Sequence, residues 1–276
     1  MNWFKLLRHD IRCGLLRWRY LTSVLLFAIP CFMFARILHQ TNIQGSWMDY
    51  MLYLFQGKEP IVRITTGERI DLPVLWLLVT SGCLFINLDY LLKDLTNAGQ
   101  QIIIRSKSRA SWYLSKCIWN LASCVVYFMA AGITCAIFTW ATGAQLSIQN
   151  TSELSFMLFG FGISEQLTLA PIYAVLASWV LPFLTMFALS MLQMTLYLFT
   201  QPIISFVICI SQLVLSIYLD SAFVLGNGAM TIRSGFAVEN GISPTISALV
   251  AIMVIIASII TGCMRFQRTD ILSLEE

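Results

Sequence analysis

Charged residues are scarce in this sequence. Only 11% of the residues are Asp, Glu, Lys or Arg, and 58% are hydrophobic, whereas a soluble globular domain carries about 25% charged residues. This shortage argues against a soluble fold. Apolar runs of roughly 20 residues, the length a helix needs to cross the hydrocarbon core of a bilayer, recur along the chain. The composition predicts an all-α integral membrane protein.

Motifs for catalysis and nucleotide binding are also missing. The chain has no G-x-x-x-x-G-K-[ST] loop, so it is not expected to bind and hydrolyse ATP by itself. The only histidines, His9 and His39, are predicted on opposite sides of the membrane, which argues against an H-E-x-x-H zinc site. The eight cysteines form no C-x-x-C pair and are interpreted as small buried hydrophobes. We therefore predict no catalytic residue and no metal ligand, and the net charge of +3 gives no indication of nucleic-acid binding.

The first 19 residues predict an amphipathic helix. At 100° per residue, Arg8 and Arg12 share a basic stripe, while Leu7 and Ile11 lie on an apolar one. Such a helix lies in a membrane interface with its arginines toward anionic headgroups. A cleaved signal peptide is the alternative, but its charged region would be shorter and a small-residue cleavage site would follow.

Six membrane spans follow and form a single transmembrane domain over residues 1–276. Proline and a capping residue mark the starts of the second and sixth spans, and Thr200-Gln201-Pro202 separates the fourth from the fifth. Pro30 and Pro182 lie inside spans, where each is expected to kink its helix. The predicted spans are 20–38, 73–92, 113–140, 172–199, 203–219 and 244–264.

Lysine and arginine counts give the orientation, because cytoplasmic loops carry an excess of these residues. One side of the predicted topology holds twelve of them, and the other holds four, or five if Arg36 is included. The richer side is therefore predicted to be cytoplasmic, and both termini lie there. Its residues are Lys5, Arg8, Arg12, Arg17, Arg19, Lys93, Arg105, Lys107, Arg109, Lys116, Arg265 and Arg268, and the outer residues are Lys58, Arg63, Arg69 and Arg233.

The outer loops contain apolar segments of their own. In 39–71, Ser46 and Asp49 fit a capping box, and Gly57 is suited to ending a short interfacial helix. Residues 220–243 are glycine-rich, half apolar and too short to span, which predicts a re-entrant or surface-lying segment.

Few polar side chains are expected within the spans. Asp89 lies near the cytoplasmic end of the second span, where it is placed either to pair with Lys93 at i+4 or to act on a substrate or proton. Asn87, Gln193 and Gln212 are expected to hydrogen-bond between helices. Asp89, Gln193 and Gln212 are our candidates for a gate or cavity.

A short basic segment, Arg105-Ser106-Lys107-Ser108-Arg109, joins the second and third spans on the cytoplasmic side. Attraction to anionic lipid would contribute about 1 kcal/mol for each basic residue. That attraction explains the charge but not the preceding isoleucines, Ile102–Ile104, or the paired serines. A docking element with an apolar core and a polar rim explains all of these features.

Taken together, these residues resemble the ABC-2 type permeases, the membrane subunits of bacterial ATP-binding cassette exporters. The resemblance rests on the six-span architecture with its N-terminal amphipathic helix, on "MDYMLYLFQGKEP" after the first span, and on "LGNGAMTIRS" before the last one. It also rests on an R-S-x-S-R-x-x-W-x-x-S-K pattern formed by Arg105, Ser106, Ser108, Arg109, Trp112, Ser115 and Lys116.

The resemblance implies both a mechanism and partners. Arg105, Ser106, Lys107, Ser108 and Arg109 would form a short helical coupling element that touches an ATPase subunit, and Arg8 and Arg12 would belong to the connecting helix. ATP and Mg²⁺ would bind in that partner, and this chain would hold no cofactor. A second permease copy or a sister permease would complete the transporter in a bacterial cytoplasmic membrane, surrounded by lipid.

Two further hypotheses belong to different classes. An intramembrane lipid-modifying enzyme would need a polar constellation at one depth, which Asp89 by itself does not supply. A membrane scaffold or immunity protein would use the same docking segment without moving cargo. In the transporter hypothesis the cargo is small and apolar or amphipathic, such as a peptide, a lipid or a drug.

Overall fold

The computed structural model describes residues 19–59, 72–88, 90, 109–154, 170–238 and 240–268. Within these ranges all regular secondary structure is helical, and pairing between extended residues is limited to isolated bridges. The amphipathic segment 1–18, which carries Arg8 and Arg12, lies outside the described residues.

Six apolar helical segments form the body of the fold in the described part of the chain. They comprise α2 (Arg19–Thr41), α4 (Val74–Asn87), α7 (Arg109–Ala141), the continuous series α9 (Pro171–Val175), η2 (Leu176–Val180) and α10 (Leu181–Leu196), then α11 (Pro202–Tyr218) and α12 (Pro244–Arg268). The short elements are α3 (Trp47–Leu54), η3 (Leu225–Ala229) and η4 (Thr231–Arg233). Each long segment overlaps one of the six predicted spans.

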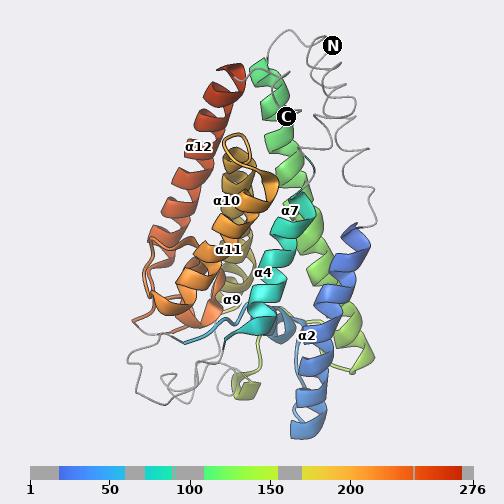
Figure 1. Ribbon diagram of the computed structural model, residues 1–276. Helices are drawn as coiled ribbons and strands as arrows, with labels where there is room; N and C mark the ends of the chain where they lie inside the picture. The colour runs from blue at the N-terminus through green and yellow to red at the C-terminus, as the bar shows by residue number, and fades with distance from the viewer. Residues whose placement is uncertain are drawn as a thin grey trace.

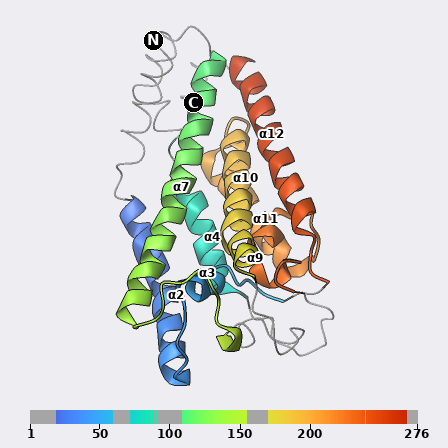
Figure 2. The same ribbon diagram turned by 180° about the vertical axis from the view of Figure 1, so that it is seen from behind.

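The helices stand side by side and alternate in direction (Figures 1 and 2). α2, α7 and α11 run one way, and α4, α10 and α12 run the other way. α10 packs along α12, and α2 packs along α7. Of these helices, only α10 and α11 are joined by a short connection, residues 197–201, which places these two helices antiparallel.

Four helical segments are long and apolar enough to cross a membrane. They are Tyr20–Thr41, Ala110–Ala141, Pro171–Leu196 and Pro244–Gln267. α4 and α11 are apolar but have only 14 and 17 residues, fewer than the roughly 20 that a full crossing needs. Length and composition therefore support four of the six predicted spans, and the shorter helices α4 and α11 overlap the other two.

Many large apolar side chains face outward. On α12, for example, Leu249, Met253, Ile256 and Ile260 are exposed at helical spacing. Water would penalise such a surface, whereas hydrocarbon would not. The four long apolar helices and their outward-facing residues indicate a multi-pass membrane protein.

Pro182 changes the helix just before it. Proline has no N–H for the carbonyl four residues earlier, so the ladder of hydrogen bonds cannot continue there as a regular α-helix. Residues Leu176–Val180 form a π-helical turn, which is a common way to accommodate such a break. Pro30, by contrast, lies inside α2 without interrupting it.

The predicted capping box at α3 is confirmed. The Ser46 side chain accepts a hydrogen bond from Asp49 N, and Asp49 Oδ2 accepts one from Ser46 N at 2.8 Å. Thr151 N and Thr151 Oγ1 also donate to this carboxylate. α3 ends at Leu54, three residues before Gly57, whose φ of +76° is a conformation that favours glycine.

Arg233 anchors the segment between α11 and α12. It is only 2% exposed, and its guanidinium donates to Ile217 O (2.9 Å) and Ser216 O at the end of α11, and to Lys58 O (2.7 Å). Asn227 Oδ1 accepts another bond at 2.7 Å. Burial lowers the pKa of Arg233, and the negative charge of Asp220 opposes that shift. The arginine therefore donates hydrogen bonds to carbonyls at the C-terminus of α11 that have no partner within the helix.

Candidate functional site

A cluster of amides and hydroxyls lies between the helices. Asn87 of α4 donates through Nδ2 to Ser190 Oγ of α10 at 2.8 Å and to Asn120 Oδ1 of α7 at 3.1 Å. Ser190 Oγ also donates to Asn120 Oδ1 at 2.7 Å. Ser123 Oγ donates to Asn87 Oδ1, and Tyr20 OH of α2 donates to Ser123 Oγ at 2.7 Å. This polar cluster links four helices where unpaired polar groups would be costly.

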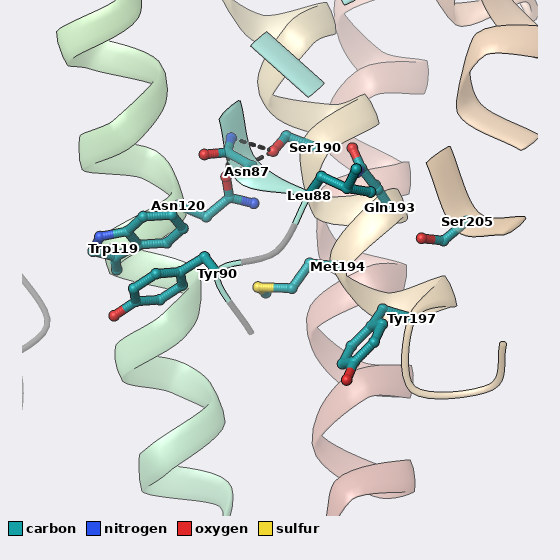
Figure 3. Close-up of a pocket in the computed structure, with 10 residues that line it drawn as sticks. All are labelled: Asn87, Leu88, Tyr90, Trp119, Asn120, Ser190, Gln193, Met194, Tyr197 and Ser205. Carbon is teal, nitrogen blue, oxygen red and sulfur yellow. Dashed lines mark hydrogen bonds between the residues drawn. The ribbon is translucent and has the colours of Figure 1, made fainter. Parts of the chain in front are cut away.

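A small cavity opens beside the polar cluster (Figure 3). Its volume is about 20 Å³, and its walls come from α4, α7, α10 and α11. Three of the side chains that line it carry a buried atom with no hydrogen-bond partner among the described residues. Two of these atoms are Asn120 Nδ2, a donor, and Gln193 Oε1, an acceptor. The third is Trp119 Nε1, which lies on the side of its ring away from Gln193 and Met194 (Figure 3). We call this space the amide cavity.

Gln193 is one of the residues that the sequence indicated. Its Nε2 donates to Leu84 O of α4 at 3.2 Å, which confirms the expected helix-to-helix hydrogen bond. Asn87 makes such bonds as well. Gln212 lies on α11, partly exposed, and does not line the amide cavity.

Other predicted site residues are not placed by the structure. Asp89, Arg105, Ser106, Lys107 and Ser108 lie outside the described residues. Arg109 is the first residue of α7, so the predicted basic segment leads directly into that helix.

Four members of the cluster were not predicted from the sequence, namely Tyr20, Asn120, Ser123 and Ser190. Asn120 is the residue that could have been found, because an asparagine within the apolar run 117–141 is as unusual as Asn87 in the second span. Ser123 and Ser190 carry no such signal, since serine is common in membrane helices and often bonds to its own helix.

Aromatic side chains surround a buried lysine next to the cavity. Lys116 Nζ lies 3.4 Å from Tyr90 OH and 4.8 Å from the centroid of the Trp112 ring. The Tyr90 ring stacks on Trp119, and both rings line the amide cavity. Cation–π attraction offsets part of the cost of burying the ammonium group.

The same end of α7 packs against two other helices. Trp112 stacks on Phe266 of α12 with ring centroids 4.7 Å apart and an interplanar angle of 15°. Tyr113 OH lies 3.0 Å from Thr195 Oγ1 of α10. The first turns of α7 are thereby attached to α10 and α12.

An apolar groove lies near the other end of α7. It has a volume of about 360 Å³ and is lined by Trp47, Gly132, Trp179 and neighbouring aliphatic residues. Trp47 Nε1 donates to Gly132 O at 3.1 Å, and a Cβ added at Gly132 would lie 2.9 Å from the Trp179 ring. Glycine at this position lets the two indoles approach the backbone of α7. We call this the tryptophan groove.

The described residues contain no group of three or more His, Cys, Asp or Glu side chains that could hold a metal ion. The polar cluster is built from neutral amides and hydroxyls, which can bind and orient polar groups through hydrogen bonds. The fold and this site define a multi-pass helical membrane protein with a polar centre.

Comparison with known proteins places the chain in a family. The family model described as "Protein of unknown function (DUF2705)" matches residues 24–272. The chain therefore belongs to the DUF2705 family. No curated protein and no solved structure matches it.

Proposed function

We propose that this protein is the membrane subunit of an ATP-binding cassette transporter of the ABC-2 type, in a bacterial cytoplasmic membrane. In this proposal it exports a small apolar or amphipathic cargo by alternating access, driven by a separate ATPase. The observation that carries the proposal is α7, which runs without a break from the predicted coupling segment to the polar cluster.

The length of α7 suits the transmission of a movement. Its 33 residues extend over about 50 Å at 1.5 Å per residue, whereas the hydrocarbon core is about 30 Å thick. Part of α7 must therefore lie outside the core or tilt strongly. A displacement at Arg109 would reach Asn120 and Ser123 through one continuous rod.

The contacts of α7 would spread that displacement. Trp112 stacks on α12, and Tyr113 lies within hydrogen-bond distance of α10. An added Cβ at Gly262 of α12 would clash with the Tyr113 ring, so these helices meet with no spare room. A packed contact of this kind moves as a unit rather than deforming gradually.

The distribution of basic residues supports the predicted topology of six spans with cytoplasmic termini. Arg109 begins α7, and Arg265 and Arg268 belong to the last turns of α12 at the same end of the bundle, whereas Arg36, Lys58 and Arg233 belong to the other end. The first end would face the cytoplasm under the positive-inside rule.

The chain has no phosphate-binding loop, so in this proposal ATP and Mg²⁺ bind in the ATPase partner. A second permease copy, or a sister permease, completes the transporter. The ATPases can drive a change of access only if they contact the coupling segment differently in two states of the permease. The tryptophan groove offers an apolar surface of the kind that the proposed cargo requires.

Charge reversal at the coupling segment tests the proposal. A permease carrying both Arg105→Glu and Arg109→Glu is expected to insert into the membrane normally but to bind its ATPase partner less tightly. Cargo should then no longer stimulate ATP hydrolysis. The control is Arg36→Glu, which reverses the charge of an exposed arginine near the end of α2. This position lies at the other end of the bundle from Arg109, so the change should leave coupling unaltered. Normal cargo-stimulated hydrolysis in the double variant would contradict the coupling role.

A further inference from the structure

The amide cavity has the size, shape and chemistry of a binding site for one small ligand. Asn120 and Gln193 are 1% and 4% exposed, and each presents one polar atom without a hydrogen-bond partner in the described part of the chain. Leaving a buried donor or acceptor unpaired costs about 1–3 kcal/mol for each group. Two such groups, which line one cavity from two helices, α7 and α10, call for a common partner.

The two atoms differ in kind, and this restricts the ligand. Asn120 Nδ2 can only donate, and Gln193 Oε1 can only accept. A ligand that bridges them must accept one hydrogen bond and donate another. Metal cations and simple anions lack one of these two capacities, whereas water has both.

The volume restricts the ligand further. A cavity of about 20 Å³ exceeds the roughly 10–15 Å³ that one water requires but does not reach the space for two. Ser205 of α11 lines the same cavity, and its hydroxyl donates to Pro202 O. Its oxygen is therefore able to accept a bond from the same ligand.

We propose that the amide cavity binds a single water molecule that accepts a hydrogen bond from Asn120 and donates one to Gln193. The water links α7 to α10 beside the polar cluster. Hydrogen bonds to water re-form quickly after a displacement. α10 can therefore shift against α7 without leaving the buried amides of Asn120 and Gln193 without a hydrogen-bond partner. This inference depends on the cavity and not on the proposed transport function.

Hydroxyl-radical labelling by X-ray pulses tests the site, because radicals form from bound water and oxidise adjacent methionine sulfur. Met194 lines the cavity, whereas Met191, three residues earlier on α10, is fully buried outside it. In the full chain in lipid nanodiscs, Met194 should be oxidised several-fold faster than Met191. Equal rates would overturn the proposal.

Variants separate bound water from simple exposure of Met194. Gln193→Leu should reduce the oxidation of Met194 to the rate of Met191, and Gln212→Leu, the same change outside the cavity, should leave it unaltered. Since Gln193→Leu also removes the bond to Leu84 O and can impair folding, a high-resolution density map of the unaltered chain gives a second measurement. A density peak within hydrogen-bond distance of both amides supports the site, and a map without one overturns it.

Discussion

At the scale of single residues, two buried ionisable side chains, Arg233 and Asp49, hold together the end of the bundle at which α7 ends. Arg233 gathers carbonyls from the end of α11 and from the segment after α3, and Asp49 ties the start of α3 to Thr151. Both are surrounded by hydrogen-bond partners, as buried charges must be to be tolerated. Their removal is expected to be costly.

Arg233→Lys tests the first of these residues. Lysine keeps the charge but cannot present the planar set of donors, so several carbonyls lose their partner. We expect a loss of about 3 kcal/mol in the free energy of unfolding, the upper range for a hydrogen bond to a charged group. Thermal unfolding in detergent measures it. Arg36→Lys, at an exposed position, should change the melting temperature little, and an equal effect of both variants would contradict the anchoring role.

Asp49 gives a prediction about pH. Burial raises the pKa of Asp49 above its ordinary value of 3.8, although hydrogen bonds from Thr151 and Ser46 act in the opposite direction. Because the folded state then binds the proton more tightly than the unfolded state, this group favours folding more as the pH falls through the raised pKa. As the pH is lowered from 7 to 4, the melting temperature of the unaltered chain should rise relative to that of Asp49→Asn. A falling difference in melting temperature would show that hydrogen bonding outweighs burial.

At the scale of elements, cysteines report how α7 packs. Cys31 of α2 lies 3.8 Å from Cys135 of α7, and Cys83 of α4 lies 3.8 Å from Cys124 of α7, measured between Sγ atoms. These pairs place α2 and α4 on different parts of α7. The prediction that the cysteines are buried is confirmed for six of the seven that the structure describes.

Oxidative cross-linking checks these two contacts. Diamide, an azo oxidant, takes two electrons and two protons from a thiol pair as the disulfide forms. We expect the cross-links Cys31–Cys135 and Cys83–Cys124 in peptide mass spectra, each lost in the Cys135→Ser or Cys124→Ser variant. Cys209, whose sulfur contacts Leu189 O, is the control and should stay reduced. Cross-links in other combinations would contradict the packing of α7.

Local signals predicted the elements better than the site. Proline marked the starts of α11 and α12, and Ser46 and Asp49 predicted the capping box of α3, because these signals act over three or four residues. A kink was predicted at Pro182, but the π-helical form of the turn before it was not, and the predicted span 73–92 is longer than α4, Val74–Asn87. The polar cluster joins Tyr20, Asn87, Asn120 and Ser190 across more than a hundred residues, and no periodicity in the sequence reveals such pairings.

At the scale of the whole molecule, we propose that α7 transmits movement from the coupling segment at its start to the polar cluster farther along the helix. The predicted coupling segment precedes Arg109, and the polar cluster and the amide cavity lie farther along α7. A force on the coupling segment would act on the contacts of α7 with α10 and α12. The account therefore requires a partner that supplies the force, because the chain has no nucleotide-binding loop.

Purification of the chain from its native membrane, followed by mass spectrometry of the bound proteins, tests this requirement most directly. The account predicts recovery of an ATPase that carries a G-x-x-x-x-G-K-[ST] motif, and its loss when Arg105 and Arg109 are both changed to Glu. Recovery of the chain without any nucleotide-binding protein, in a preparation that still supports the cellular activity, would contradict the transporter proposal.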